Sequence, residues 1–210
     1  MLCSKCSAVV HPIVAVDVDG TLGDWHYQFL RFASDYFGKT FDIRMYDGTG
    51  SLAEAMGVSL EDYRTCKLAF RQSGMKRAMR AFPGAAELTQ AIKRMGAELW
   101  ITTTRPYLQV GNVDPDTREW LNRFNIDYDH LLYDDDKYAE LAQQVEPKRV
   151  VAVVDDEPSM YDRALDVGFH PILLARIHNR RNHRPVTADN LATVAFMVGE
   201  RIEHWRKRNA

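Results

Sequence analysis

The sequence predicts an α/β protein built on a doubly wound parallel sheet, and two observations carry this prediction. Short apolar runs rich in β-branched residues stand at 13–16, 99–101 and 150–154, and each ends abruptly at a polar cluster. Such runs are typical of strands buried on both faces of a parallel sheet. From Ala85 onward, helical and strand patterns alternate, as repeated βα units require. Because ligands bind at the carboxyl edge of such a sheet, we expect the polar clusters to meet there.

The first half of the chain places a helical insertion after the first strand. Aromatic and apolar residues repeat at helical spacing from Trp25, and Gly38 supplies a stop signal. A second helical block is expected over residues 52–82, with Ser59 as a start signal near its middle. Residues 23–82 are therefore expected to form a mostly helical insertion.

The second half of the chain is expected to alternate between helices and strands. Its last helix is expected to be capped by Thr187 and to carry an apolar stripe from Leu191 to Trp205. The other expected elements, in order, are a helix at 85–95, a strand at 99–101, a helix at 116–124, a strand at 131–133, a helix at 137–145, a strand at 150–154, a helix at 160–167 and a strand at 171–174.

Composition narrows the class of protein. The 210 residues are 46% apolar and 27% charged, with a net charge of -2, which is typical of a globular protein and lowers the expectation of a long polyanionic substrate. No apolar stretch is long enough to cross a bilayer, and no signal-peptide pattern precedes the first strand, so we expect a cytoplasmic protein without a membrane partner. Cys3 and Cys6 lack a second cysteine pair, which favours a reduced terminus over a zinc site. A homo-oligomer remains possible.

The first polar cluster, Asp17-x-Asp19-Gly20-Thr21, has the chemistry of phosphoryl transfer. Asp17 and Asp19 are two residues apart at a strand end, and Gly20 permits a sharp turn, so both carboxylates can face the crevice. One Asp can attack phosphorus to form an aspartyl-phosphate, while the other protonates the leaving oxygen and later deprotonates water. A turn in which both Asp residues bond the local backbone is the alternative.

The second cluster, Thr102 to Arg105, can bind phosphoryl oxygens. A hydroxyl and backbone N–H groups at a strand end suit this task, and we favour Thr103 among the three threonines. Arg105 can add a charged, bidentate contact to the phosphate. A threonine run at a strand end can also reflect strand propensity alone.

The third cluster, Asp155-Asp156, follows five apolar residues and indicates a metal site. Carboxylates gathered around a phosphate would repel it, and Mg2+ resolves this repulsion by binding carboxylates, water and phosphate oxygen. Lys137, at a helix start, can neutralise the gathered negative charge as a point cation, and Lys148 is the competing choice.

In their order along the chain these motifs resemble the haloacid dehalogenase (HAD) superfamily of phosphatases. The resemblance implies a Rossmann-like core with Asp17 as the nucleophile and Asp19 as the general acid/base. It also implies that Thr103, Arg105 and Lys137 bind the phosphate or the nucleophile. The Mg2+ ligands would come from Asp17, Asp19, Asp155 and Asp156, with Asp156 assisting directly or through water.

The resemblance also assigns a role to the insertion. Residues 23–82 stand where the family carries its C1 cap, which closes over the site and reads the leaving group. Residues 1–22 and 83–210 would then form the catalytic core. Helices that simply pack on the core are the alternative.

Two subgroups are most similar in pattern, namely the 5'(3')-deoxyribonucleotidases and the 3'-phosphatase domain of polynucleotide kinases. The chain departs from both at Glu157, where an Arg is expected, and a kinase P-loop is absent from the sequence. Aromatic residues such as Trp25, Tyr27, Phe29 and Tyr46 can stack on a base, although their helical spacing favours a place in the core of the insertion. The neutral-to-acidic charge balance favours a nucleoside monophosphate, or another small phosphomonoester, as the substrate.

Other functions remain open at this stage. The arginines between 176 and 184 are the argument for a nucleic-acid 3'-phosphatase, although a solvated loop also accounts for them. A small-metabolite phosphatase is a further alternative. A non-catalytic HAD-like binding module would be expected to lack one of the key aspartates, and all are present.

Overall fold

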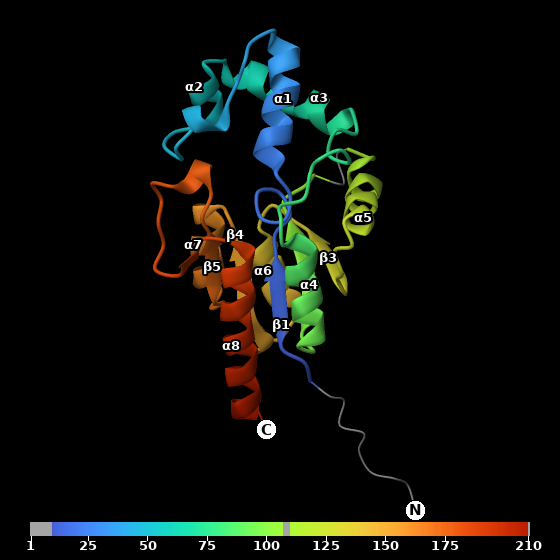
Figure 1. The fold of residues 1–210 in the computed structure, drawn as a ribbon, viewed down its shortest axis with the longest axis vertical. Coiled ribbons are helices and arrows are strands. Elements are labelled where there is room, and N and C mark those ends of the chain that lie inside the picture. The colour runs from blue at the N-terminus through green and yellow to red at the C-terminus, as the bar shows by residue number, and fades with distance from the viewer. Residues whose placement is uncertain (1–9, 107–109, 210) are drawn as a thin grey trace, which may run out of the picture.

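A computed structural model describes residues 10–106 and 110–209, and it confirms the doubly wound parallel sheet. The described strands form one parallel sheet in the order β3-β2-β1-β4-β5-β6 (Figure 1). Their bounds are β1 (Ile13–Val16), β2 (Glu98–Thr103), β3 (His130–Tyr133), β4 (Val150–Asp155), β5 (Pro171–Leu174) and β6 (Thr187–Ala188).

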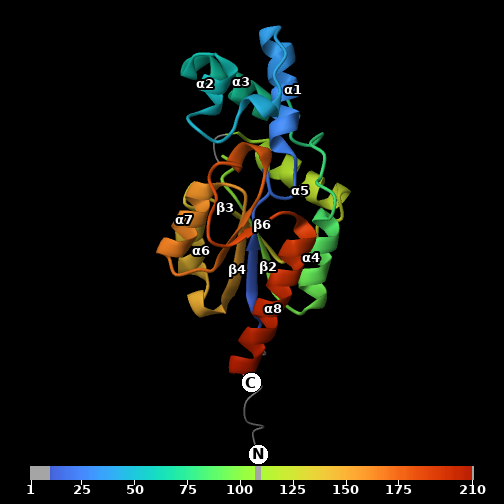
Figure 2. The ribbon, with the colours of Figure 1, turned by 60° about the vertical axis from the view of Figure 1, so that its left-hand side comes forward.

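Helices cover both faces of this sheet, which is why its central strands are uniformly apolar. One face carries α4 (Ala85–Arg94), α5 (Val113–Arg123) and α8 (Leu191–Asn209), and the other carries α6 (Lys137–Gln144) and α7 (Pro158–Asp166), as Figure 2 shows. Within β1, Val14 and Val16 pack into the first layer, whereas Ile13 and Ala15 pack into the second. The strand thus has no solvent face, as its sequence indicated.

The insertion lies beyond the carboxyl ends of the central strands (Figures 1 and 2). It contains α1 (Trp25–Phe37), a 3₁₀ turn η1 (Ile43–Met45), α2 (Leu52–Met56) and α3 (Leu60–Gln72). The Trp25, Phe29 and Phe70 rings pack together, with Trp25 and Phe29 stacked at a centroid separation of 4.8 Å. This aromatic cluster is continuous with the core on the α4 face.

The two segments that join the insertion to the sheet run side by side. Asp24 N donates to Arg80 O over 2.9 Å, and the Arg80 guanidinium forms an ion pair of 2.6 Å with the Asp24 carboxylate. Gly23 and Ala81 form an antiparallel bridge between the same segments. On α5, Trp120 Nε1 donates to Met79 O over 2.6 Å. Both connections are therefore fixed to each other and to the core.

Several predicted helix boundaries are wrong. The expected block 52–82 breaks at Gly57, which has a left-handed backbone, and residues 73–82 form turns instead of helix. Ser59 does cap α3, since its hydroxyl accepts from Asp62 N over 3.0 Å. The reason for the break is that Gly57 ends one helix in the conformation that glycine adopts most easily.

Three further helix starts differ from the prediction. Thr187 does not cap the last helix, because it pairs with Leu173 in β6, and Asn190 accepts from Thr193 N at the start of α8 instead. Helix α5 begins at Val113 and not at Asp116. Helix α7 begins at Pro158, two residues before the expected start, because Glu157 caps it and proline suits the first helical position.

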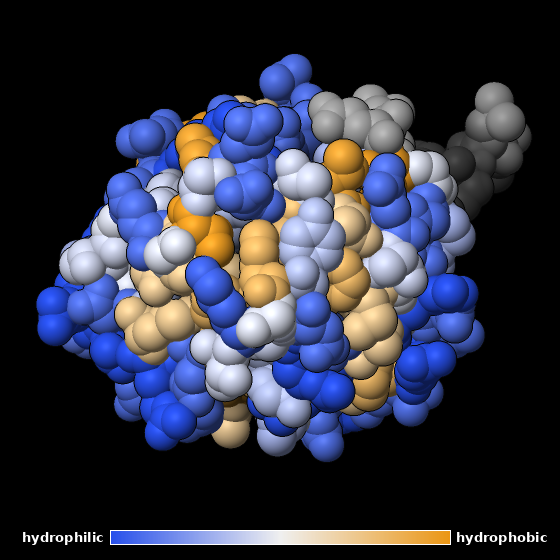
Figure 3. Space-filling model, turned by 90° about the horizontal axis from the view of Figure 1, so that it is seen from above, coloured by the Kyte–Doolittle hydropathy of each residue, from blue (hydrophilic) through white to orange (hydrophobic). Residues whose placement is uncertain are grey.

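The end of the molecule formed by the insertion mixes apolar and hydrophilic side chains, as Figure 3 shows. Exposed apolar residues here include Tyr27, Tyr36, Met45, Leu60 and Leu68. Within the described ranges, no helix combines the length and apolar character that crossing a membrane demands.

Candidate active site

A cavity of about 300 Å³ lies at the carboxyl edge of the sheet, between the strand ends and the insertion. Asp17 and Asp19 reach it from the loop after β1, Asp155 and Asp156 from the end of β4, and Lys137 from the start of α6. The structure therefore brings together polar residues from three separate parts of the sequence, as the sheet topology predicts.

Lys137 lies at the centre of the acidic residues. Its Nζ is 2.5 Å from Asp17 Oδ1 and 2.7 Å from Asp155 Oδ2, and the Lys137 side chain is 1% exposed. Burial alone would lower the pKa of Lys137, but the Asp155 and Asp17 charges raise it above the ordinary range. Tyr138 donates to Asp155 Oδ2 over 2.5 Å. The structure thus brings Lys137 to the site, whereas Lys148 is exposed and paired with Glu146.

Asp19 is held by two cations. Arg105 donates from Nε to Oδ2 over 2.9 Å and from Nη2 to Oδ1 over 2.5 Å, while Lys76 Nζ lies 2.5 Å from Oδ2. Burial alone would raise the pKa of Asp19, but Arg105 and Lys76 hold it well below the usual range. Arg105 also donates to Thr117 Oγ1 over 2.7 Å. Arg105 therefore lines the cavity with its guanidinium already bound to Asp19 and Thr117, so that in this geometry it positions Asp19 and is not a free phosphate ligand.

Lys76 is a site residue that the sequence did not indicate. It lies between α3 and the sheet, and only 3% of its surface is exposed. Burial and the nearby Arg105 lower its pKa to about 7, against the opposing pull of Asp19. In the sequence it is one of several cations in this stretch, such as the exposed Arg77, and only the packing of the insertion against the core distinguishes it.

Asp156 fixes the loop after β1. Thr21 Oγ1 donates to Asp156 Oδ1 over 2.9 Å, and His178 Nε2 lies 2.7 Å from Asp156 Oδ2. Burial alone would raise the pKa of Asp156, but His178 beside it keeps that pKa below the usual range. A Cβ at Gly20 would lie 2.0 Å from Asp156 Oδ2, and the φ of Gly20 is +99°. Glycine is therefore required at this turn, as predicted.

Three carboxylates lie close enough together to hold one cation. Asp17, Asp155 and Asp156 each offer one oxygen, and these oxygens lie within 4.8 Å of one another. Burial raises the pKa of Asp17, Lys137 opposes the rise, and Asp155 and Asp156 add to it, so that the net pKa is well above the usual range. Such crowding fits a hard divalent cation, which favours all three ionised forms. The Asp19 carboxylate lies outside this group, because Arg105 and Lys76 bind it.

The threonine run divides into a core part and a cavity part. Thr103 is the last residue of β2 and is 1% exposed, and among the described residues it is Thr104 that lines the cavity. The structure therefore brings Thr104 to the cavity wall and leaves Thr103 just beneath it.

Aromatic residues of the insertion reach the cavity only in part. Trp25, Tyr46 and Tyr63 line it, whereas Phe29 is fully buried in the aromatic cluster. The Tyr27 ring packs under the Arg80 guanidinium, 3.9 Å from its centroid. Helical spacing alone did not distinguish these two groups.

The arginines at 176–184 are engaged in contacts within the chain. Arg176 donates to Gly20 O over 2.8 Å and to Thr21 O over 2.9 Å. Arg181 pairs with Asp47 of the insertion over 2.8 Å, and Arg184 pairs with Asp162 over 2.6 Å. This segment therefore joins the insertion to the core, while the Arg180 and Arg181 side chains stay exposed.

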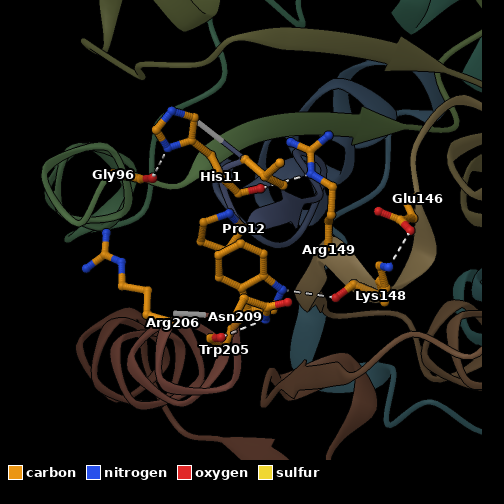
Figure 4. Close-up of a pocket in the computed structure, with 10 residues that line it drawn as sticks. His11, Pro12, Gly96, Glu146, Lys148, Arg149, Trp205, Arg206 and Asn209 are labelled. Carbon is orange, nitrogen blue, oxygen red and sulfur yellow. Dashed lines mark hydrogen bonds and ion pairs between the residues drawn. The ribbon is translucent and has the colours of Figure 1, made fainter. Parts of the chain in front are cut away.

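A larger cavity, of about 640 Å³, lies at the opposite edge of the sheet (Figure 4). Its polar groups bind one another: Trp205 Nε1 donates to Lys148 O over 3.2 Å, and Arg149 Nε donates to His11 O over 3.0 Å. Glu146 lines it and pairs with Lys148 over 2.7 Å. Without a set of converging carboxylates, this cavity lacks the chemistry of the first.

The fold is similar to that of solved hydrolases of the haloacid dehalogenase (HAD) type. No known family model matches the chain, and no curated protein matches it. A HAD family hydrolase from Deinococcus radiodurans, solved with bound phosphate and sodium, is 18% identical with a TM-score of 0.65, covering 91% of this chain and 96% of its own.

Two further structures have the same fold. A predicted phosphoglycolate phosphatase from Haemophilus somnus is 15% identical with a TM-score of 0.63, covering 89% of this chain and 97% of its own. CbbY from Rhodobacter sphaeroides, in complex with xylulose-1,5-bisphosphate, is 17% identical with a TM-score of 0.58. The match covers 87% of the chain described here and 96% of the CbbY chain. The chain described here therefore has the HAD hydrolase fold.

Proposed function

We propose that the protein is a HAD-type phosphatase, a Mg2+-dependent phosphoric monoester hydrolase. The observation that carries this proposal is the buried contact of Lys137 with both Asp17 and Asp155, with Asp19 held on the same loop as Asp17. In this proposal Asp17 is the nucleophile, Lys137 neutralises the gathered charge, and Asp19 is the second carboxylate; all three side chains line one cavity. The solved hydrolases of this fold, including one with bound phosphate, support the same chemistry.

In the proposed reaction, an Asp17 oxygen attacks phosphorus and the bond to the leaving oxygen breaks. The leaving oxygen takes a proton from Asp19, and the phosphoryl group remains on Asp17 as an acyl phosphate. Asp19 then removes a proton from water, the water oxygen attacks phosphorus, and the Asp17–phosphorus bond breaks. Inorganic phosphate and free Asp17 result, so that atoms and charge balance over the cycle.

The ion pairs of Asp19 favour one half of this cycle. Held by Arg105 and Lys76, Asp19 is ionised and suited to deprotonate water. To donate a proton it must first gain one, which requires weaker contact with at least one cation. Lys76 comes from the insertion, so a shift of the insertion would release it while Arg105 stays with the core.

Asp17, Asp155 and Asp156 would hold Mg2+, and Thr103 or Thr104 with Lys137 would hold the phosphoryl oxygens. The cation supplies charge neutralisation, which allows a phosphate dianion to approach these carboxylates. Residues 23–82 would act as a C1 cap over a core made of 1–22 and 83–210. A cap here would exclude water and read the leaving group.

The nucleoside monophosphate remains a candidate substrate. Trp25, Tyr46 and Tyr63 line the cavity on the side of the insertion, where a base could stack. For the 3'-phosphatase alternative, Arg176 and Arg184 are bound to groups within the chain, whereas Arg180 and Arg181 stay exposed and could meet a phosphate backbone. A small-metabolite phosphatase fits the cavity of about 300 Å³ equally well.

Steady-state hydrolysis of a phosphomonoester such as p-nitrophenyl phosphate tests the proposal. We expect turnover with Mg2+, loss of turnover with EDTA, and a fall of about a thousandfold or more in Asp17→Asn, since the amide is no nucleophile. Asp166→Asn, on the exposed side of α7, is the matched control and should retain activity. Full activity of Asp17→Asn would rule out the assigned nucleophile.

A further inference from the structure

Two cations of α3 face the cavity without a carboxylate partner. Lys67 and Arg71 stand four residues apart on the helix and both line the cavity. The other lysines and arginines of the cavity wall are bound: Lys76 and Arg105 to Asp19, and Lys137 to Asp17 and Asp155. Among the described residues, neither Lys67 nor Arg71 has a carboxylate oxygen within 4.0 Å of its side-chain nitrogens.

This arrangement is costly in the free protein. Like charges four residues apart on a helix repel each other, and burial leaves less water to screen them. Burial and the Arg71 charge lower the pKa of Lys67 to about 8. Lys67 Nζ lies 5.3 Å from the centre of the Trp25 ring and 5.6 Å from that of Tyr63. The two rings hold the ammonium in place but do not neutralise it.

The two cations lie on the wall that the leaving group would face. In the proposed reaction the transferred phosphoryl group contacts the strand-edge residues, above all Asp17 and Lys137. Lys67 and Arg71 come instead from α3, which belongs to the insertion beyond the strand ends (Figures 1 and 2). Asp19 attracts both cations electrostatically, but it is already bound to Lys76 and Arg105.

We propose that Lys67 and Arg71 bind a second anionic group, carried by the leaving group of the substrate. The substrate class is thus a small phosphomonoester that also bears a carboxylate or a second phosphate, not one with a neutral alcohol as its leaving group. This inference rests on the proposed phosphatase function. The cavity volume of about 300 Å³ favours a compact molecule of this class.

A matched substrate series tests the inference. We choose phosphate monoesters of ω-hydroxy carboxylic acids with one to four methylenes, each compared with its neutral carboxamide. A nucleoside 3',5'-bisphosphate compared with the 5'-monophosphate distinguishes a second phosphate from a carboxylate. We expect one chain length, or the bisphosphate, to exceed its neutral partner in kcat/KM by about tenfold or more, as charge-assisted hydrogen bonds provide.

Variants identify the residues responsible. Lys67→Met and Arg71→Met should each remove most of this preference while leaving kcat/KM for the neutral partner within about threefold. Arg64→Met, an exposed cation on the same helix, is the matched control and should keep the preference. Equal loss on the charged and neutral substrates would show that the two cations serve the transferred phosphate, and would overturn the inference.

The outcomes separate this inference from the proposed function. Hydrolysis of p-nitrophenyl phosphate with no preference in any pair leaves the phosphatase intact and overturns the second-anion site. If no substrate is hydrolysed, the phosphatase proposal fails. Calorimetric binding of the carboxylate and carboxamide substrates to the Asp17→Asn variant still decides the inference. Tighter binding of the carboxylate than of the carboxamide, lost in Lys67→Met, supports it, and equal affinities contradict it.

Discussion

Lys67 keeps a positive charge where its surroundings disfavour it. Its ammonium faces the Trp25 and Tyr63 rings, the Arg71 charge repels it and the Asp19 charge attracts it. Burial is the largest of these effects, and the resulting pKa is about 8, against 10.5 for a lysine in water. The charge is thus retained near neutral pH at a cost in stability.

This cost predicts a pH dependence of folding. Between about pH 8 and 10.5 the unfolded chain binds more protons at Lys67 than the folded chain, so stability rises with pH in this window. Relative to Lys67→Met, the unfolding free energy of the wild type should rise by up to about 1.4 kcal/mol per pH unit. Urea denaturation at a series of pH values measures it. Parallel curves for the two proteins would contradict a lowered pKa.

At the same scale, the sequence revealed some site residues and concealed others. Asp17, Asp19, Asp155 and Asp156 stand at strand ends, where the apolar runs mark their position, and the structure brings them to one cavity. Lys76, Lys67 and Arg71 have no such marker, because cations are frequent on helical surfaces. Which helix face meets the cavity depends on how the insertion packs, and that is a long-range property.

The loop after β1 depends on an element distant in sequence. Arg176, two residues after the end of β5, donates to the carbonyl oxygens of Gly20 and Thr21, and its guanidinium lies 3.7 Å from the centre of the Phe82 ring. A planar, forked donor can make both bonds and stack at the same time, which a lysine cannot. The position of the Asp17 and Asp19 loop therefore rests on this arginine.

Arg176→Lys should loosen that loop without unfolding the protein. We expect the unfolding free energy to fall by about 1 to 2 kcal/mol, since a point-like ammonium loses the stacking on Phe82 and cannot reproduce the forked pair of hydrogen bonds. In the proposed phosphatase reaction kcat should fall about tenfold, because a small displacement of Asp17 from its attacking position slows the reaction. Arg180→Lys is the control, since its bond to Arg44 O is 3.5 Å long. Unchanged kcat in Arg176→Lys would show that the loop holds its position without this arginine.

Element types were predicted better than element ends. The apolar runs and the helical periodicities identified the strands at 13–16, 99–101 and 150–154 and the helices that cover them. Residues 73–82 were expected to be helical, yet they form turns whose backbone groups bind across to the core, as Met79 O does to Trp120. Hydrogen bonds to residues far away in the sequence cannot be predicted from a local pattern. Here they replace the backbone hydrogen bonds that a helix would have made.

For the molecule as a whole, one edge of the sheet concentrates negative charge, and Lys137 contacts two of the carboxylates that carry it. Asp17, Asp155 and Asp156 are each at most 5% exposed. A bound divalent cation would relieve the repulsion among all three carboxylates only in the folded state, because Asp17 is far from Asp155 and Asp156 in an unfolded chain. Metal binding should therefore be coupled to global stability.

Mg2+ at about a hundredfold excess over its dissociation constant should raise the thermal midpoint by about 5 to 10 °C. Asp155→Asn should abolish this rise, whatever it does to the midpoint without metal. Differential scanning fluorimetry with Mg2+, and with NaCl at equal ionic strength, measures both. An equal rise with NaCl would point to general screening instead of a specific site.

The close pairing of Asp24 with Arg80 has a consequence for how such a protein can diversify. Because the insertion enters and leaves at adjacent points, it can be replaced as one module without disturbing the strand order beneath it. A chimera would keep its chemistry and acquire new selectivity, provided that the incoming module again supplies a cation to Asp19. Lys76 would then be the one residue of the module that recombination could not exchange freely.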